Sequence, residues 1–145
     1  MKTRFPYVCA VFLLLIEDGK ILLQRRFQTG HEDGNYGVPS GHMDGGETPR
    51  EACAREGAEE IGIKIRPEDL TMVHTMYRSS ENERVDFCMT ASRYEGEVQN
   101  METHKCDDLQ WFPLDALPDN TIDYVRQAIT AYQKGVTYSE YKPAD

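Results

Sequence analysis

The sequence has few of the features that mark a disulfide-rich, zinc-binding or basic protein. Its four cysteines are far apart and form no CxxC pair, which argues against a zinc site, a thioredoxin-like motif and a disulfide framework. Only 16 Lys and Arg stand against 25 Asp and Glu, so the net charge is −9. A binder of duplex nucleic acid needs a basic surface, so we expect no nucleic-acid partner.

The sequence also lacks a hydrophobic run long enough to span a bilayer, which takes about 20 residues. The apolar run Tyr7–Ile16 follows a basic start, as in a secretory signal, but no small-residue cleavage site comes after it. Instead Asp18-Gly19 leads to a second apolar run at Ile21–Leu23, which favours a β-hairpin with a type I′ turn. We therefore expect a cytoplasmic protein with no membrane partner.

The 145 residues have the size of one domain, and no repeat, low-complexity stretch or linker divides them. We expect a single domain over residues 1–145. Capping signals predict a helix over 48–61, in which Thr48 is the N-cap, Pro49 the first helical residue and Glu51 the partner in a capping box. Gly62 is predicted to end this helix.

Hydrophobic periodicity predicts the remaining elements. Apolar and polar residues alternate from 84 to 94, which predicts a strand that is apolar on one face and antiparallel to 70–78. Short strands are expected at 63–65 and at 109–112. Apolar residues at helical spacing predict a last helix over 121–134, with Asn120 as a capping residue. Strands interleaved with two helices indicate an α/β or α+β fold, with helices packed on a mixed sheet.

The predicted first helix and the loop before it are dense in carboxylates. Six acidic residues lie between positions 44 and 60, against only two arginines. At 100° per residue, Glu56, Glu59 and Glu60 share one face, near the helix end where the dipole disfavours negative charge. A solvated acidic face is the ordinary explanation of such a pattern. A divalent cation would relieve both penalties, and oxygen-only ligands favour Mg²⁺ or Mn²⁺.

These residues stand in a pattern that closely resembles the Nudix box of MutT-type diphosphohydrolases. Gly41 is followed after five residues by Glu47, after a further seven by Arg55-Glu56, and then by Glu59-Glu60 and Gly62. So many specified positions at fixed spacing make the signal highly specific. The segments 22–26 and 109–118 are also similar to the family, so the resemblance covers most of the chain. Gly57 departs from the pattern, because the family usually has an aliphatic residue there.

The resemblance implies a mixed sheet sandwiched between helices, with a divalent metal carried by the loop and helix of the box. It implies hydrolysis of a nucleoside diphosphate linked to a further group X. Glu56 and Glu60 are the expected metal ligands, and Glu59 is a third ligand or the general base. A backbone carbonyl at Ser40 or Gly41 completes the expected inner shell.

Several roles stay open or are secondary at this stage. Glu102 is the other candidate for the general base, since related enzymes draw a carboxylate from the loop before the segment 109–112. Arg55 and Glu47 are expected to form an ion pair that fixes the loop against the helix. Arg25 and Arg26 are predicted to bind a substrate phosphate or to form surface ion pairs. The histidines are interpreted as ordinary core or surface residues.

The substrate is the least determined feature. The region where ADP-ribose-cleaving members have a proline, and dinucleoside-polyphosphate enzymes a tyrosine, holds Arg78, Ser79 and Ser80. The SQPWPxPxS-like signature of NADH-cleaving relatives is also missing. We expect a small-molecule substrate, a (deoxy)nucleoside triphosphate that yields nucleoside monophosphate and pyrophosphate.

Three alternatives remain beside this expectation. The first is a hydrolase of ADP-ribose or a nucleotide sugar, the second is a ligand-sensing module without catalysis, and the third is an isomerase of an isoprenoid diphosphate. Sensing modules commonly lose box carboxylates and adjoin a DNA-binding domain, whereas this chain keeps the carboxylates and has no spare length. The full box and the short chain also disfavour the isomerase. The sequence does not predict an oligomeric state.

Overall fold

The chain folds around a central strand, β1 (Val8–Leu13), in the computed structural model, which describes residues 2–143. Successive side chains of β1 point to opposite faces. Ala10 and Phe12 enter one apolar cluster, whereas Val11 and Leu13 enter another. The apolar run that mimics a signal peptide is thus a strand buried on both faces. Residues 1 and 144–145, the ends of the predicted single domain, lie outside the described part of the chain.

Two sheets carry the fold. The first is mixed, with strand order β5-β1-β7-β6-β9, and β1 runs parallel to β7. Its other strands are β5 (Ser40–His42), β6 (Leu70–Ser79), β7 (Glu83–Ala91) and β9 (Tyr138–Tyr141). In the second sheet, β3 pairs antiparallel with the other three strands. These strands are β2 (Ile16–Glu17), β3 (Lys20–Arg26), β4 (Tyr36–Gly37) and β8 (Cys106–Pro113).

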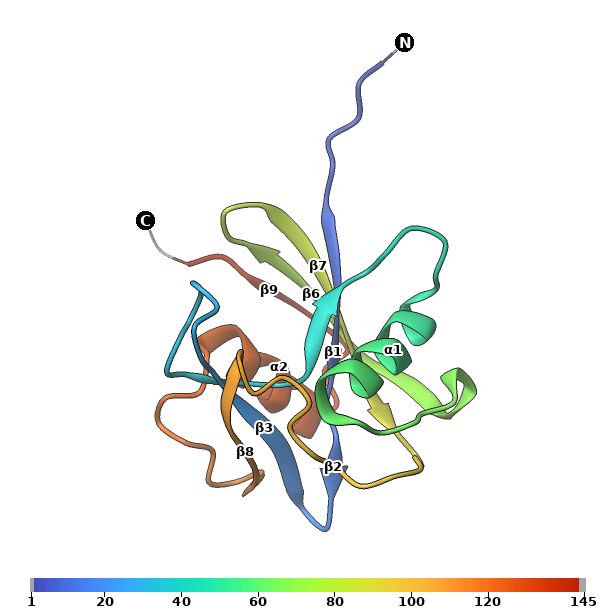
Figure 1. Cartoon of the computed structure of the whole chain (residues 1–145). Helices are drawn as coiled ribbons and strands as arrows, with labels where there is room; N and C mark the ends of the chain where they lie inside the picture. The colour runs from blue at the N-terminus through green and yellow to red at the C-terminus, as the bar shows by residue number, and fades with distance from the viewer. Residues whose placement is uncertain (1, 144–145) are drawn as a thin grey trace.

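Two helices, α1 (Pro49–Ile61) and α2 (Asp123–Gln133), pack on different sides of β1 (Figure 1). Cys53 of α1 belongs to the apolar cluster of Val11, and Ala128 of α2 to the cluster of Ala10. This arrangement confirms the predicted fold class, a mixed sheet held between helices. A short 3-10 helix, η1 (Pro67–Asp69), lies between α1 and β6. Within residues 2–143, no helix combines the length and the apolar character needed to cross a membrane.

The ends of α1 are formed as its sequence predicts. The Thr48 hydroxyl accepts the N–H of Glu51 at 3.2 Å, and the Glu51 carboxylate accepts the N–H of Thr48 at 2.9 Å. Pro49 occupies the first helical position, and Gly62 ends the helix in the left-handed conformation, at φ 71°. Local signals alone therefore determine where this helix begins and ends.

The predicted hairpin exists at its turn but is shorter than expected. Asp18 and Gly19 both have positive φ, 50° and 75°, as a type I′ turn requires. Only β2 pairs across this turn with β3, because β1 lies in the other sheet between β5 and β7. The predicted strand at 63–65 is wrong, since Lys64 forms only an isolated bridge to Glu95. The strands β4, β5 and β9 are too short to show a clear alternation in sequence.

One further prediction needs correction. Asn120 does not cap α2, because its amide donates to the carbonyl of Gly34 at 2.8 Å and Ile122 holds the N-cap position without a side-chain bond. The face of β7 that carries polar residues is buried in part, because Asp86 and Cys88 are both 0% exposed. Cys88 packs in the core cluster that includes residues of α2, and Asp86 is paired with a residue of β6.

The cysteines and the buried histidine have ordinary structural roles, as interpreted from the sequence. All four cysteines are free thiols, and burial raises the pKa of Cys53 to about 12, which leaves it protonated and unreactive. The ring of His74 is buried between the carbonyl of Val136 at 2.8 Å and the hydroxyl of Ser139 at 2.7 Å.

Gly57 packs against the core without a side chain. A Cβ at this position would lie 3.3 Å from Cδ1 of Ile65 and 3.6 Å from Cδ2 of Leu13. We predict that Gly57→Val lowers the free energy of unfolding by about 1–3 kcal/mol through overpacking. Ala58→Val, at the next and exposed position, should cost less than about 1 kcal/mol. Urea denaturation measures both, and a Gly57→Val protein as stable as the wild type would contradict the packing argument.

Candidate active site

Two carboxylates of α1 face the backbone of β5. One oxygen of Glu60 accepts the N–H of Ser40 at 2.8 Å, and the other accepts the amide of Gln24, on β3, at 2.9 Å. Glu56, one turn earlier on the same helix face, is buried against Gly41. The structure thus brings Ser40, Gly41, Glu56 and Glu60 together from two consecutive elements, β5 and α1.

Gly41 makes the approach of Glu56 possible. A Cβ at position 41 would lie 2.1 Å from Oε1 of Glu56 and 2.2 Å from its Cδ, far inside the separation that unbonded atoms tolerate. A side chain at position 41 would therefore displace the carboxylate of Glu56 from the place that it occupies.

Burial is the dominant electrostatic influence on this pair. It raises the pKa of Glu60 to about 8, and the charge of Glu56 raises it further, while hydrogen bonds from Gln24 and Ser40 oppose the shift. Burial also raises the pKa of Glu56, against the opposing effect of the Arg55 guanidinium. Both carboxyl groups therefore resist ionisation, and a nearby cation would stabilise their ionised forms.

Arg55 connects the loop before α1 to the acidic face of the helix. Its guanidinium donates to Glu47 at 2.7 and 3.1 Å, to Glu56 at 2.8 Å and to Glu59 at 3.3 Å. It also donates to the carbonyl of His42 at 3.1 Å. The expected contact between Arg55 and Glu47 is present, and the pKa of Glu47 lies below its ordinary value because of the Arg55 hydrogen bonds.

The carboxylates of this face are suited to a hard divalent cation for two reasons. They supply oxygen ligands, and they are acidic groups held close together with little exposure to water. Within residues 2–143, no three His, Cys, Asp or Glu side chains converge as the ligands of an ion would. The contacts above explain why: Arg55 binds Glu56 and Glu59, while Gln24 and the backbone of Ser40 hold Glu60.

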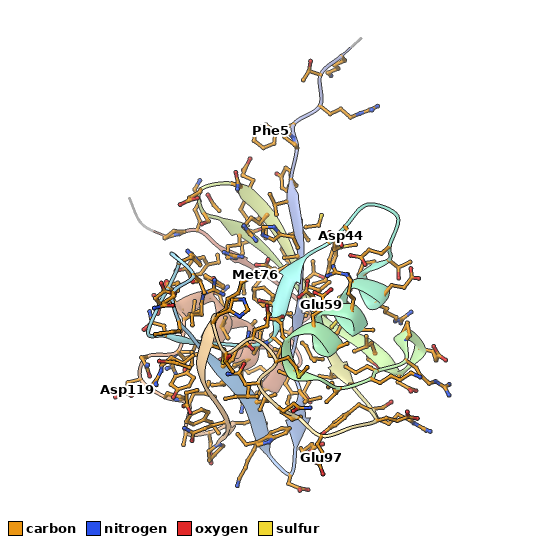
Figure 2. The ribbon with its side chains drawn as sticks, in the orientation of Figure 1. Phe5, Asp44, Glu59, Met76, Glu97 and Asp119 are labelled. Carbon is orange, nitrogen blue, oxygen red and sulfur yellow. The ribbon has the colours of Figure 1, made fainter. Side chains whose placement is uncertain are left out.

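A cleft of about 800 Å³ runs along these residues. Asp44 and Glu59, both labelled in Figure 2, line it together with Glu56 and Glu60. Glu102, from the loop before β8, lines it as well, so both candidates for the general base face the same space. The side chain of Glu59 is 55% exposed, whereas that of Glu102 is 27% exposed and lies 3.8 Å from the Lys105 ammonium.

Two of the residues predicted from sequence lie outside the lining of the cleft. Arg25 makes an ion pair with Asp107 at 2.8 Å, and Glu47 is turned toward Arg55 in the loop. Arg26 does line the cleft, and its Nε donates to the carbonyl of His31 at 2.6 Å. The neighbours Arg25 and Arg26 therefore have different surroundings, because successive residues of a strand point to opposite sides.

Sequence reasoning missed a group of cleft residues on the mixed sheet. Arg78 of β6 and Arg84 of β7 line the cleft opposite Tyr124 of α2. Arg78 is 4% exposed and makes an ion pair with the buried Asp86 at 2.6 Å. The signal in the sequence was Arg84 and Asp86 at alternate positions of β7. Such a pair indicates an exposed face unless it is known that α2 covers that face.

The comparisons with known proteins agree with this geometry. A family model described as the NUDIX domain matches residues 6–132, so the chain belongs to the Nudix hydrolase family. The structure superposes on the MutT NUDIX hydrolase from Burkholderia pseudomallei with a TM-score of 0.79 and 27% identity. That match covers 86% of this chain and 97% of the other.

Two curated relatives share parts of the sequence. The NAD-capped RNA hydrolase NudC of Vibrio atlanticus (strain LGP32) is 28% identical over 148 residues, and the match covers 90% of this chain. The putative 8-oxo-dGTP diphosphatase 3 of Mycobacterium tuberculosis (strain H37Rv) is 42% identical over 43 residues, or 30% of this chain. The chain spans about half the length of the NudC relative, 52%, and 20% of the other.

Glu60 makes the stability of the metal-free protein depend on pH. Its folded-state pKa of about 8 exceeds the ordinary value of 4.5, so the folded state binds the proton more tightly than the unfolded state. We predict that this contribution is fully present below about pH 4.5 and is lost as the pH rises through about 8.

The substitution Glu60→Gln removes the ionisable group and should flatten this dependence. Thermal denaturation with a chelator, at intervals from about pH 5 to 9, measures the wild type and the variant side by side. Equal slopes in the two proteins would show that the carboxyl group of Glu60 titrates at its ordinary pKa.

Proposed function

We propose that this chain hydrolyses the diphosphate link of a small-molecule nucleotide, with Mg²⁺ or Mn²⁺ as its cofactor. The observation that carries the proposal is the pair of adjacent carboxyl groups of Glu56, which is buried, and Glu60, which is half-buried, in the wall of a large cleft. Membership in the Nudix hydrolase family supports the reaction class.

In this proposal Glu56, Glu60 and Glu59 hold the cation, with a backbone carbonyl of Ser40 or Gly41 beside them. When bound, the cation neutralises charge that develops on the diphosphate oxygens and orients a water molecule. Arg55 and Glu47 are positioning residues, because their contacts fix the loop against α1.

The chemical step needs a proton acceptor. Water attacks one phosphorus, the bond from that phosphorus to the bridging oxygen breaks, and the proton of the water passes to a carboxylate. Glu59 and Glu102 both line the cleft and are the two candidates. Arg26 would contact a phosphate oxygen, a role that its position in the lining of the cleft supports, whereas Arg25 is paired with Asp107 outside that lining.

For the substrate we propose a (deoxy)nucleoside triphosphate, cleaved to nucleoside monophosphate and pyrophosphate. The name of the Mycobacterium tuberculosis relative, a putative 8-oxo-dGTP diphosphatase, favours this class. The NudC relative is named for NAD-capped RNA, which keeps dinucleotides and capped RNA in the panel of compounds to test. The four free thiols agree with the expected cytoplasmic location.

The proposal is tested by assaying phosphate and pyrophosphate release across a nucleotide panel with Mg²⁺. The panel contains deoxynucleoside triphosphates, an oxidised triphosphate, ADP-ribose, nucleotide sugars, NAD and NAD-capped RNA. We predict turnover of a triphosphate, and a loss of about a hundredfold or more in Glu60→Gln. Glu97→Gln is the matched control, since Glu97 is an exposed carboxylate outside the cleft (Figure 2).

Two outcomes would overturn the proposal. Equal activity of Glu60→Gln and the wild type would remove the carboxyl pair from the reaction. Tight binding of one compound with no turnover of any would favour the ligand-sensing alternative.

The two candidate bases are separated by comparing Glu59→Gln with Glu102→Gln at saturating Mg²⁺. Loss of a general base should lower kcat by about 10²- to 10⁴-fold, because the water must then attack the phosphorus without a carboxylate to accept its proton. A variant that retains nearly wild-type kcat is excluded from the role. If both retain it, the base lies elsewhere in the cleft.

A further inference from the structure

Arg84 is a cation in the cleft that has little compensation from its own protein. Its Nη2 donates to Nε2 of His42 at 2.9 Å, and its Nε is buried without a hydrogen-bond partner among residues 2–143. None of the ion pairs in that part of the chain involves Arg84, although the protein carries a net charge of −9. A buried donor that lacks a partner costs free energy and usually has one under working conditions.

The neighbouring Arg78 shows what a compensated arginine looks like at this place. It pairs across the strands with Arg84, and its guanidinium bonds both oxygens of Asp86, at 2.6 and 3.3 Å. The same guanidinium lies 3.9 Å from the centre of the Tyr124 ring. Its charge and donors are therefore used within the fold, whereas Arg84 has no ion pair among residues 2–143 and its Nε–H has no acceptor there.

The electrostatic surroundings of Arg84 point the same way. Burial lowers the pKa of Arg84, and the positive charge of Arg78 lowers it further, against the smaller opposing effects of Asp86, Tyr124 and Glu81. The folded protein thus holds a cation at some cost beside a second cation. An anion next to Arg84 would accept a hydrogen bond from its unpaired donor and would offset the repulsion between Arg84 and Arg78.

The position of Arg84 relates it to the carboxylate pair. Along β5, His42 stands two residues after Ser40, whose N–H is bonded to Glu60, and these two residues span about 7 Å of strand. His42 contacts Arg84, and all of these residues line the same cleft. A substrate whose diphosphate lies at Glu56 and Glu60 would therefore place the group next to the diphosphate near Arg84.

We propose that Arg84, supported by His42, binds an anionic group of the substrate adjacent to the cleaved diphosphate. This inference rests on the proposed function and narrows its substrate to a nucleoside diphosphate whose group X carries a phosphate or a carboxylate. A nucleoside triphosphate has this property, and a nucleotide sugar with a neutral sugar does not.

The direct test observes the Nε–H resonance of Arg84 by NMR in the metal-free protein, where turnover plays no part. Its assignment comes from its loss in Arg84→Lys. We expect inorganic phosphate and glucuronate to shift this resonance, and glucose to leave it unmoved. The Nε–H of Arg25, which is bonded to Asp107 outside the cleft, is the internal control. An Arg84 resonance that moves no more than that of Arg25 would overturn the proposal.

A kinetic test uses two substrates that differ only in charge, a nucleoside diphosphate glucose and the corresponding glucuronate, beside a triphosphate of the same base. Arg84→Gln should raise KM about tenfold or more for the triphosphate and the glucuronate, since a charge-assisted hydrogen bond is lost. The neutral glucose compound should change less than about twofold, and Arg84→Lys should restore part of the loss.

The outcomes separate this inference from the proposed function. If phosphate binds at Arg84 but no compound turns over, the anion site stands and the hydrolase proposal fails. If compounds turn over while Arg84→Gln affects charged and neutral ones alike, or alters only the preferred base, the anion site is refuted and the hydrolase proposal remains.

Discussion

Two carboxyl groups of like charge, Glu56 and Glu60, lie side by side in the wall of a cleft, and much of the surrounding structure serves to hold them there. The helix α1 presents both from one face, the backbone of Ser40 and the amide of Gln24 fix one of them, and Gly41 leaves room for the other. Burial disfavours the charged form of each group and so raises both pKa values. The charge of Glu56 raises the pKa of Glu60 further. A cation bound beside them would offset this cost.

The acidic character of the chain makes the distribution of charge in the cleft informative. Three of the lining carboxylates come from α1, where Arg55 is the cation among them, and four further cations line the rest of the cleft together with Glu81 and Glu102; these four are Arg26, Arg78, Arg84 and Lys105. A nucleotide with several phosphates is repelled by the first group and attracted by the second. The cleft thus has one region suited to a cation and another suited to an anion, and a polyphosphate needs both.

Features encoded in local sequence were predictable, whereas features that arise from pairing of distant segments were not. The caps of α1 at Thr48 and Gly62, the shared face of Glu56 and Glu60, and the family pattern all follow from residues close in sequence. The hydrogen bond from Gln24 to Glu60 joins residues 36 positions apart and depends on how β3 meets α1. Nothing in the local pattern indicates such a contact.

The errors have the same physical origin. The apolar run that begins at Tyr7 was expected to pair with the run Ile21–Leu23 across the Asp18-Gly19 turn. Instead β1 lies inside the other sheet, between β5 and β7, where most of its side chains are buried. The alternation along β7 does not indicate whether its polar face is covered, and tertiary packing buries Asp86 there against Arg78. For the same reason the arginines of the cleft, Arg78 and Arg84, were not recognised from their sequence positions.

Titrating the protein with Mn²⁺, and measuring the free ion by electron paramagnetic resonance, shows whether Glu56 and Glu60 form a cation site. The wild type should bind Mn²⁺ at millimolar concentrations or below, and Glu60→Gln should bind it about tenfold more weakly or worse. Glu97→Gln should match the wild type, since its carboxylate lies outside the cleft. Absence of binding in the wild type, or equal affinity in Glu60→Gln, would contradict the claim that the carboxyl pair is a cation site.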